Sequence, residues 1–231
     1  MYTETLTLAN GVKIPQLGLG TWFIDDANAA EAVKAAAKLG YRHFDTAQAY
    51  GNERGVGEGV RSCGVAREEL FVVSKVAAEH KTYEAAKASI DATLQKMGLD
   101  YLDMMIIHSP QPWDKVNQCE DRYVEGNRAA WRALEEAYKE GKLRAIGVSN
   151  FQIGDLNSLL EGCTVKPMVN QILLHISNTP LELVEFCQNN GIAVEAYSPI
   201  AHGEILHQPE IQAMAEKYGV AVPQLCIRYT L

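Results

Sequence analysis

The sequence predicts an α/β fold, a (β/α)8 TIM barrel preceded by an N-terminal β-hairpin. Apolar runs of strand length alternate with segments of helical periodicity along the chain, a pattern typical of parallel strands joined by helical crossovers. Glycine follows several predicted helices shortly before the next strand, at positions where helices commonly end. Polar residues stand at the carboxyl ends of the predicted strands, where the active sites of barrels lie.

The predicted elements begin with the hairpin. Residues 5–8 and 12–14 are short alternating runs around Asn10-Gly11, a pair that favours a tight turn because it accepts positive φ angles. The interior strands of the barrel are then expected at residues 17–22, 41–44, 71–75, 102–108, 145–150, 167–171 and 192–197.

Helical segments connect these strands. The first spans residues 29–39 and stops before Gly40. Later helices end where another glycine follows, near Met97, Glu140, Glu161 and Asn190. Thr179 is expected as the N-cap of one helix, with Pro180 at its first helical position. Two further helices, at residues 209–218 and 223–231, follow the last predicted strand.

Residues 1–231 are expected to form a single barrel domain, because no linker interrupts them. A barrel of this type takes about 250 residues, so the chain is expected to lack the eighth strand and the C-terminal loop. An open barrel would expose two sheet edges, and we therefore expect a longer polypeptide in the cell or a disordered tail.

An open, doubly wound sheet is the alternative fold. Its usual phosphate-binding sequence, GxGxxG, is not found in this chain. Gly18-Leu19-Gly20 is not followed by a third glycine, and Gly55-Val56-Gly57-Glu58-Gly59 falls within a predicted helix. Both glycine clusters are therefore interpreted as structural.

The composition argues against several classes of protein. The chain has 231 residues, of which 47% are hydrophobic, and its formal net charge of −8 comes with scattered lysines and arginines; this is unlike a nucleic-acid-binding or membrane-surface protein. Five cysteines without metal-ligand spacing favour free thiols in a reducing compartment. No signal peptide or run of about 18 apolar residues is present. The chain is expected to be cytoplasmic and soluble.

Polar residues that could carry chemistry follow the predicted strands, and they are Asp45, Lys75, His108, Ser149, Asn150, Gln171 and Tyr197. Lys75 ends an apolar run, so its ammonium should be partly buried and should need a nearby acid, for which Asp45 is the natural candidate.

Each residue also has a structural interpretation. Asp45 and Lys75 are equally consistent with a structural ion pair, and His108, Tyr50, Trp22 and Trp113 taken singly are more typical of packing residues. His43, His175 and His202 are left outside the site. An acid, a lysine, a phenol and an imidazole at one barrel mouth together favour an active site.

Seven motifs resemble, in their order along the chain, those of the aldo-keto reductases. They are His43-Phe44-Asp45-Thr46-Ala47, Tyr50-Gly51-Asn52-Glu53, Val73-Ser74-Lys75-Val76, Ile106-Ile107-His108-Ser109-Pro110, Ile146-Gly147-Val148-Ser149-Asn150-Phe151, Asn170-Gln171 and Tyr197-Ser198-Pro199. The resemblance extends from the hairpin to Leu231. Within the family, the chain is most similar to the bacterial 2,5-diketo-D-gluconate reductase-like branch.

The resemblance implies a monomeric enzyme that reduces an aldehyde or ketone to an alcohol with NADPH, the substrate being a small molecule such as a sugar-derived or dicarbonyl compound. It implies that Tyr50 is the proton donor of a tetrad completed by Asp45, Lys75 and His108. The substrate pocket is expected to include Trp22, Tyr50, His108 and Trp113. The expected cofactor contacts, with Tyr197 stacked on the nicotinamide, are Thr21, Trp22, Asp45, Ser149, Asn150, Gln171, Tyr197 and Ser198.

The chemistry of these residues agrees with such roles. A phenol with an ordinary pKa of ~10 stays protonated at neutral pH, and Lys75⁺ beside it would make it a stronger acid. Asp45 would keep Lys75 charged and in place. Neutral His108 could donate a hydrogen bond to the oxygen on which charge develops.

Two other functions are considered. A nicotinamide-sensing regulatory or binding protein would use the same fold with little turnover, but it would not need the tetrad. A metal-dependent barrel hydrolase is disfavoured, because His43 and His108 make no ligand set with the carboxylates, and no metal site is expected. The family's basic segment that grips the adenosine 2′-phosphate is absent, so NADPH is preferred to NADH on the resemblance alone.

Overall fold

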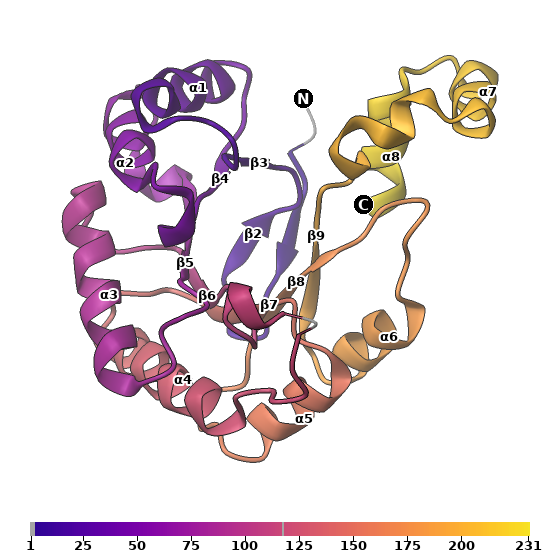
Figure 1. Cartoon of the computed structure of the whole chain (residues 1–231). Helices are drawn as coiled ribbons and strands as arrows, with labels where there is room; N and C mark the ends of the chain where they lie inside the picture. The colour runs from indigo at the N-terminus through magenta and orange to yellow at the C-terminus, as the bar shows by residue number, and fades with distance from the viewer. Residues whose placement is uncertain (1–2, 117) are drawn as a thin grey trace.

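The computed structural model describes residues 3–116 and 118–231. Within these residues, seven strands form one parallel sheet in sequence order, from β3 to β9, and the sheet curves into an almost closed barrel (Figure 1). The strands are β3 (Gly18–Gly20), β4 (His43–Asp45), β5 (Phe71–Val76), β6 (Met104–Ile107), β7 (Ile146–Ser149), β8 (Val169–Leu173) and β9 (Ala193–Tyr197). The predicted interior strands and their order are confirmed, and an eighth barrel strand is absent from the described residues.

Helices cover the outside of the sheet. The helices α1 to α6 form an arc around the strands, whereas α7 and α8 lie beyond β9 at the open side of the barrel (Figure 1). Their bounds are α1 (Asp26–Lys38), α2 (Glu53–Ser62), α3 (Tyr83–Met97), α4 (Val124–Lys139), α5 (Ile153–Leu160), α6 (Leu181–Asn189), α7 (Pro209–Tyr218) and α8 (Val222–Thr230). No helix of the described ranges combines the length and apolarity needed to cross a bilayer.

The predicted hairpin is present as β1 (Thr5–Thr7) and β2 (Lys13–Pro15), which pair antiparallel. Gly11 adopts a φ of 87°, but Asn10 is not among the residues with positive φ. The Asn10 side chain instead donates to the carbonyl oxygen of Arg144 at 2.9 Å, just before β7. The carbonyl oxygen of Pro15 lies 3.1 Å from Nδ1 of His43, at the start of β4. The hairpin therefore covers the amino ends of the strands.

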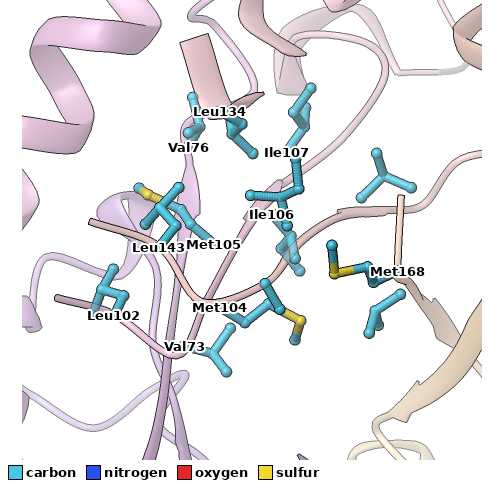
Figure 2. Close-up of a cluster of buried hydrophobic side chains, with 14 of the residues drawn as sticks. Val73, Val76, Leu102, Met104, Met105, Ile106, Ile107, Leu134, Leu143 and Met168 are labelled. Atoms are coloured by element: carbon cyan, nitrogen blue, oxygen red, sulfur yellow. The ribbon is translucent and has the colours of Figure 1, made fainter. Parts of the chain in front are cut away.

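The core lies between the strands and their covering helices. Every residue of β5 and β6 is buried, as expected for parallel strands covered on both faces. Burial of one such apolar side chain contributes roughly 1.5–3 kcal/mol. Figure 2 shows part of this cluster, in which side chains of β5 and β6 gather with Leu102, Leu134, Leu143 and Met168.

The glycines of α2 explain how closely the first three helices pack. A Cβ atom on Gly55 would lie 2.1 Å from the carbonyl oxygen of Asp26 in α1, and one on Gly57 would lie 2.2 Å from that of Met97 in α3. These distances are far below van der Waals contact, so neither position accepts a larger residue without movement of backbone. The structural interpretation of the Gly55–Gly59 cluster is confirmed.

The predicted start of one helix is wrong. Helix α6 begins at Leu181, and Pro180 precedes it with a φ of −78° and a ψ of 77°. Thr179 does not cap the helix, because its hydroxyl donates to the carbonyl oxygen of His175 at 3.2 Å. The bridge between His175 and Asn178 closes a turn just before the helix, and this turn determines the direction of Thr179.

The packing of α2 leads to a stability prediction. Gly57→Ala should lower the free energy of unfolding by about 1–3 kcal/mol, the usual cost of overpacking. The matched control is Gly154→Ala in α5, where a Cβ atom would meet nothing within 4 Å; it should be neutral or stabilising by up to about 1 kcal/mol. Urea unfolding of both variants measures the difference, and equal stabilities would contradict the packing argument.

Candidate active site

The buried ammonium of Lys75 is the centre of the site. Lys75 is fully buried on β5, and its Nζ forms an ion pair with Asp45, as predicted. The same Nζ donates to the carbonyl oxygen of Thr46 at 2.9 Å and to the Tyr50 hydroxyl at 3.2 Å. Burial by itself lowers the pKa of Lys75, but Asp45 and Tyr50 together hold that pKa above its ordinary value. Lys75 is therefore a fixed cation at neutral pH.

A short loop after β4 carries Tyr50. The phenol ends a 3-10 turn, Gln48–Tyr50, and Gly51 follows with a φ of 71°, a conformation that glycine adopts without strain. Asn52 is fully buried, and its side-chain nitrogen donates to the carbonyl oxygens of Thr21 and Ile24, both at 2.8 Å. The loop is thus tied to the segment after β3, and Tyr50 is held over the strand ends.

A buried carboxylate supports the same loop from the other side. Glu53, the first residue of α2, is fully buried. It accepts hydrogen bonds from Ser74 at 2.6 Å, from Thr93 at 2.9 Å and from Lys96 at 2.9 Å. Ser74 immediately precedes Lys75 on β5, so Glu53 links the start of α2 to the strand that carries the ammonium.

The phenol of Tyr50 is kept protonated. Burial raises the pKa of Tyr50, the charge of Lys75 lowers it, and that of Asp45 raises it again, and the result lies above the ordinary value of 10.0. The acid-strengthening effect expected of Lys75 is present, but burial outweighs it. At neutral pH the Tyr50 oxygen therefore carries a proton that it can donate.

His108 lies beside the phenol, immediately after β6. Its ring is 5.5 Å from that of Tyr50 and 4.9 Å from that of Trp113, measured between centroids, in edge-to-face arrangements. Burial, and secondarily the charge of Lys75, lowers the pKa of His108 from 6.5 to about 3. The imidazole is therefore neutral over the physiological range, as expected. Its Nδ1 is buried and has no hydrogen-bond partner in the described part of the chain.

Residues at the ends of β7, β8 and β9 form a connected polar set. Ser149 donates to the carbonyl oxygen of Gln171 at 2.8 Å. Asn150 has a φ of 63°, and its amide donates to the carbonyl oxygen of His108 at 2.9 Å. The Tyr197 hydroxyl donates to Asn150 Oδ1 at 2.8 Å. The structure therefore brings the predicted cofactor residues of three strands together beside His108.

One cavity of about 1630 Å³ extends from this set through the open side of the barrel. Its lining includes the predicted residues Trp22, Trp113 and Ser198 together with Tyr50 and Tyr197. Trp22 and Trp113 are 50% and 42% exposed, so their rings are available to a ligand.

Thr21 is the one predicted contact whose side chain does not face this space. It is fully buried, and its hydroxyl donates to the carbonyl oxygen of Asp45 at 2.9 Å. Thr21 therefore fixes the end of β4 and does not line the cavity.

Two titratable residues inside the barrel, Glu195 and His43, lie next to the predicted site but do not belong to it. Glu195 stands directly opposite Gln171 in the register of β8 and β9, and the Gln171 amide donates to Glu195 at 2.9 Å and to Asp45 at 3.0 Å. His43 Nε2 lies 3.8 Å from the Glu195 carboxylate. An acid in the middle of the apolar run 193–197 is the signal in the sequence that could have revealed Glu195.

The site combines an uncharged proton donor, a fixed cation and a neutral imidazole beside an amide-rich cavity. Such an arrangement suits transfer of a proton to an oxygen that gains negative charge. The aldo/keto reductase family model matches residues 16–231. The chain belongs to the aldo/keto reductase family. It is accordingly an oxidoreductase of the class of NADP-dependent aldo-keto reductases.

Similar proteins include enzymes with named reactions. The chain is 45% identical to a glyoxal reductase of Bacillus subtilis over 229 residues, which cover 99% of the chain and 79% of that enzyme. It is 38% identical to a glycerol 2-dehydrogenase (NADP(+)) of Saccharomyces cerevisiae, covering 94% of the chain and 76% of the relative. The narrower resemblance to the 2,5-diketo-D-gluconate reductase-like branch stays a prediction.

Solved structures share the fold. An aldo/keto reductase from Brucella melitensis superposes with a TM-score of 0.89 at 38% identity, covering 98% of this chain and 84% of that one. A Bombyx mori aldo-keto reductase in complex with NADP gives a TM-score of 0.85 at 32% identity, covering 99% and 80%. No group of three or more histidine, cysteine, aspartate or glutamate side chains that could hold a metal occurs among the described residues.

The ion pair of Lys75 generates the first prediction for this site. Asp45→Asn leaves the buried ammonium without its counter-charge, so the free energy of unfolding should fall by about 3–5 kcal/mol. Glu31→Gln, which breaks the exposed pair with Lys34, is the control and should change the stability little. Urea denaturation at pH 7 measures both variants. An Asp45→Asn protein as stable as the wild type would show that Lys75 does not depend on this acid.

The lowered pKa of His108 predicts a pH effect on stability. Because the unfolded chain binds this proton near pH 6.5 and the folded chain only near pH 3, the neutral imidazole stabilises the fold above pH 6.5, and this contribution is lost as the pH falls. From pH 7 to pH 5 the wild type should lose about 2 kcal/mol more than His108→Gln. Unfolding titrations at both pH values test this, with exposed His207→Gln as control. Parallel losses in wild type and His108→Gln would refute it.

Proposed function

We propose that this protein reduces a small aldehyde or ketone to an alcohol with NADPH, and that Tyr50 is the proton donor. The observation that carries the proposal is the position of Lys75 Nζ, paired with Asp45 and 3.2 Å from the Tyr50 hydroxyl. A purely structural ion pair would not require a protonated phenol beside it. The proposal treats residues 1–231 as one barrel domain. The monomeric state and the cytoplasmic location of the protein stay predictions.

The residues of the connected polar set fit a nicotinamide group. A carboxamide offers one acceptor oxygen and one NH2 donor, and Ser149, Asn150 and Gln171 carry hydroxyl and amide groups beside the cavity. The aromatic ring of Tyr197 forms part of the cavity wall. These residues would hold the nicotinamide end of the cofactor, together with Trp22 and Ser198 at the rim. When bound, this group supplies the hydride for the substrate carbonyl.

The residues of the chain handle the proton and the developing charge. As negative charge develops on the carbonyl oxygen of the substrate, the Tyr50 hydroxyl donates its proton to that oxygen. Lys75⁺, fixed by Asp45, then stabilises the resulting phenolate. The unpartnered, buried Nδ1 of His108 favours the tautomer protonated on Nε2, because an unpaired donor is costlier to bury than an unpaired acceptor. His108 thus has an N–H to donate to the same substrate oxygen.

The walls of the cavity indicate the kind of substrate. Trp22 stacks on Phe23 with ring centroids 4.2 Å apart, and Trp113 packs edge-to-face against His108. Apolar walls around one polar centre suit a small carbonyl compound and exclude water. A dicarbonyl substrate is supported by the likeness to a glyoxal reductase, and we propose this class.

Tyr50→Phe tests the function. The change removes the transferable proton but keeps the ring, so kcat for a panel of aldehydes, ketones and dicarbonyls should fall by about 10²–10⁴-fold or more. The dissociation constant for NADPH should change little. NADPH oxidation followed by absorbance, with NADH in parallel, measures the first quantity, and fluorescence titration measures the second.

A matched control is Tyr218→Phe on α7, which removes an exposed hydroxyl and should leave turnover unchanged. Equal turnover by Tyr50→Phe and the wild type would refute the role of Tyr50. Tight NADPH binding by the wild type without turnover of any carbonyl would instead favour a cofactor-sensing binding protein.

A further inference from the structure

The amide of Gln171 lies between two carboxylates. Gln171 and Glu195 are direct partners in the register of β8 and β9, so their side chains project from the same face of the sheet. Gln171 Nε2 donates to Glu195 Oε1 at 2.9 Å and to Asp45 Oδ2 at 3.0 Å. An amide nitrogen has two N–H groups, and both are used here. The side-chain carbonyl oxygen of Gln171, Oε1, is therefore the atom of this amide that is available to bind a ligand.

Asp45 alone would not fix the orientation of this amide. The last side-chain torsion of glutamine is broad, so one hydrogen bond to Asp45 Oδ2 lets the plane of the amide turn. The second acceptor, on Glu195, holds the nitrogen from another direction. With both bonds made, the position of Oε1 is determined as well.

Glu195 is itself held in place. Its side chain is 21% exposed, and its Oε1 lies 3.8 Å from His43 Nε2. The other ring nitrogen of His43, Nδ1, lies 3.1 Å from the carbonyl oxygen of Pro15, so Nδ1 carries a proton. At 3.8 Å the contact between His43 Nε2 and Glu195 Oε1 is longer than a hydrogen bond. His43 therefore limits the space around Glu195 on the hairpin side of the barrel without bonding to it.

We propose that Glu195 is a positioning residue of the nicotinamide site, which fixes the Gln171 amide so that Oε1 accepts a hydrogen bond from the NH2 of the nicotinamide carboxamide. This inference rests on the proposed function. Glu195 acts through Gln171 and does not touch the reacting atoms. The group that Glu195 helps to recognise is the carboxamide NH2, and this recognition can be measured without turnover.

The test compares two nucleotides by calorimetric titration. In 3-acetylpyridine adenine dinucleotide phosphate, a methyl group replaces the carboxamide NH2 of NADP⁺. The wild type should bind NADP⁺ about 3- to 10-fold more tightly than this analogue, the value of one neutral hydrogen bond. In Glu195→Met, which removes the acceptor at similar size, the ratio of the two dissociation constants should fall to about 1.

Two further variants separate the proposed role from a structural one. Glu195→Gln should keep the wild-type ratio, because its carbonyl oxygen, in the position of Oε1, can still accept from Gln171. Glu195→Ala should lose the discrimination as Glu195→Met does, and it provides the same test if the Met variant does not fold. Glu182→Met, which replaces an exposed acid on α6, is the matched control and should keep the ratio.

The possible results are distinct. An undiminished ratio in Glu195→Met or Glu195→Ala, or a wild type that binds both nucleotides equally, overturns the role of Glu195 and leaves the proposed function standing. A folded wild type that binds neither nucleotide overturns the proposed function, and the inference with it. Loss of the ratio in Met and Ala with its retention in Gln supports the role of Glu195.

Discussion

The charge of Lys75, buried in the barrel interior, is the constraint on which the rest of the site depends. Removing an ammonium from water costs several kcal/mol unless an opposite charge and further acceptors replace the lost hydration. Asp45 and the carbonyl oxygen of Thr46, both from the end of β4, provide them. The third contact of the ammonium is the Tyr50 hydroxyl. Because the buried ammonium of Lys75 needs these partners, Asp45 and Tyr50 both lie next to its Nζ atom.

The fold makes this arrangement rigid through its apolar strands and its buried polar anchors. The strand that carries Lys75 is buried along its whole length, so the ammonium cannot reach water without disrupting the core. The loop that carries Tyr50 is anchored by Asn52 and Glu53, both fully buried. Helix α2 packs closely against α1 and α3, which only glycine permits at Gly55 and Gly57. This close packing keeps Asn52 and Glu53, at the start of α2, next to their hydrogen-bond partners.

The barrel could be predicted from the sequence because it depends on local patterns, whereas the tetrad is what the resemblance of seven motifs to the aldo-keto reductases implies. Strand length, alternation with helices and glycine after helices identify the strands, and the residue after a strand is at the mouth wherever the sheet is parallel. The Thr179 cap is wrong because a local hydrogen bond to His175 uses that hydroxyl, and the Thr21 side chain is turned from the cavity by its tertiary hydrogen bond to Asp45. Glu195 was not identified, since its partner Gln171 is on another strand and only the register pairs them.

Burial shifts the pKa values of Tyr50 and His108, the two groups proposed to contact the substrate oxygen, in opposite directions. It raises the pKa of Tyr50 and lowers that of His108, and in both cases it favours the uncharged form. The phenol and the imidazole therefore each keep a donor proton across neutral pH, while the fixed positive charge stays on Lys75 next to Asp45. In the proposed mechanism, the same low-dielectric surroundings would strengthen the attraction between Lys75⁺ and the phenolate of Tyr50. The burial that weakens Tyr50 as an acid at rest thus also strengthens the interaction that stabilises its conjugate base.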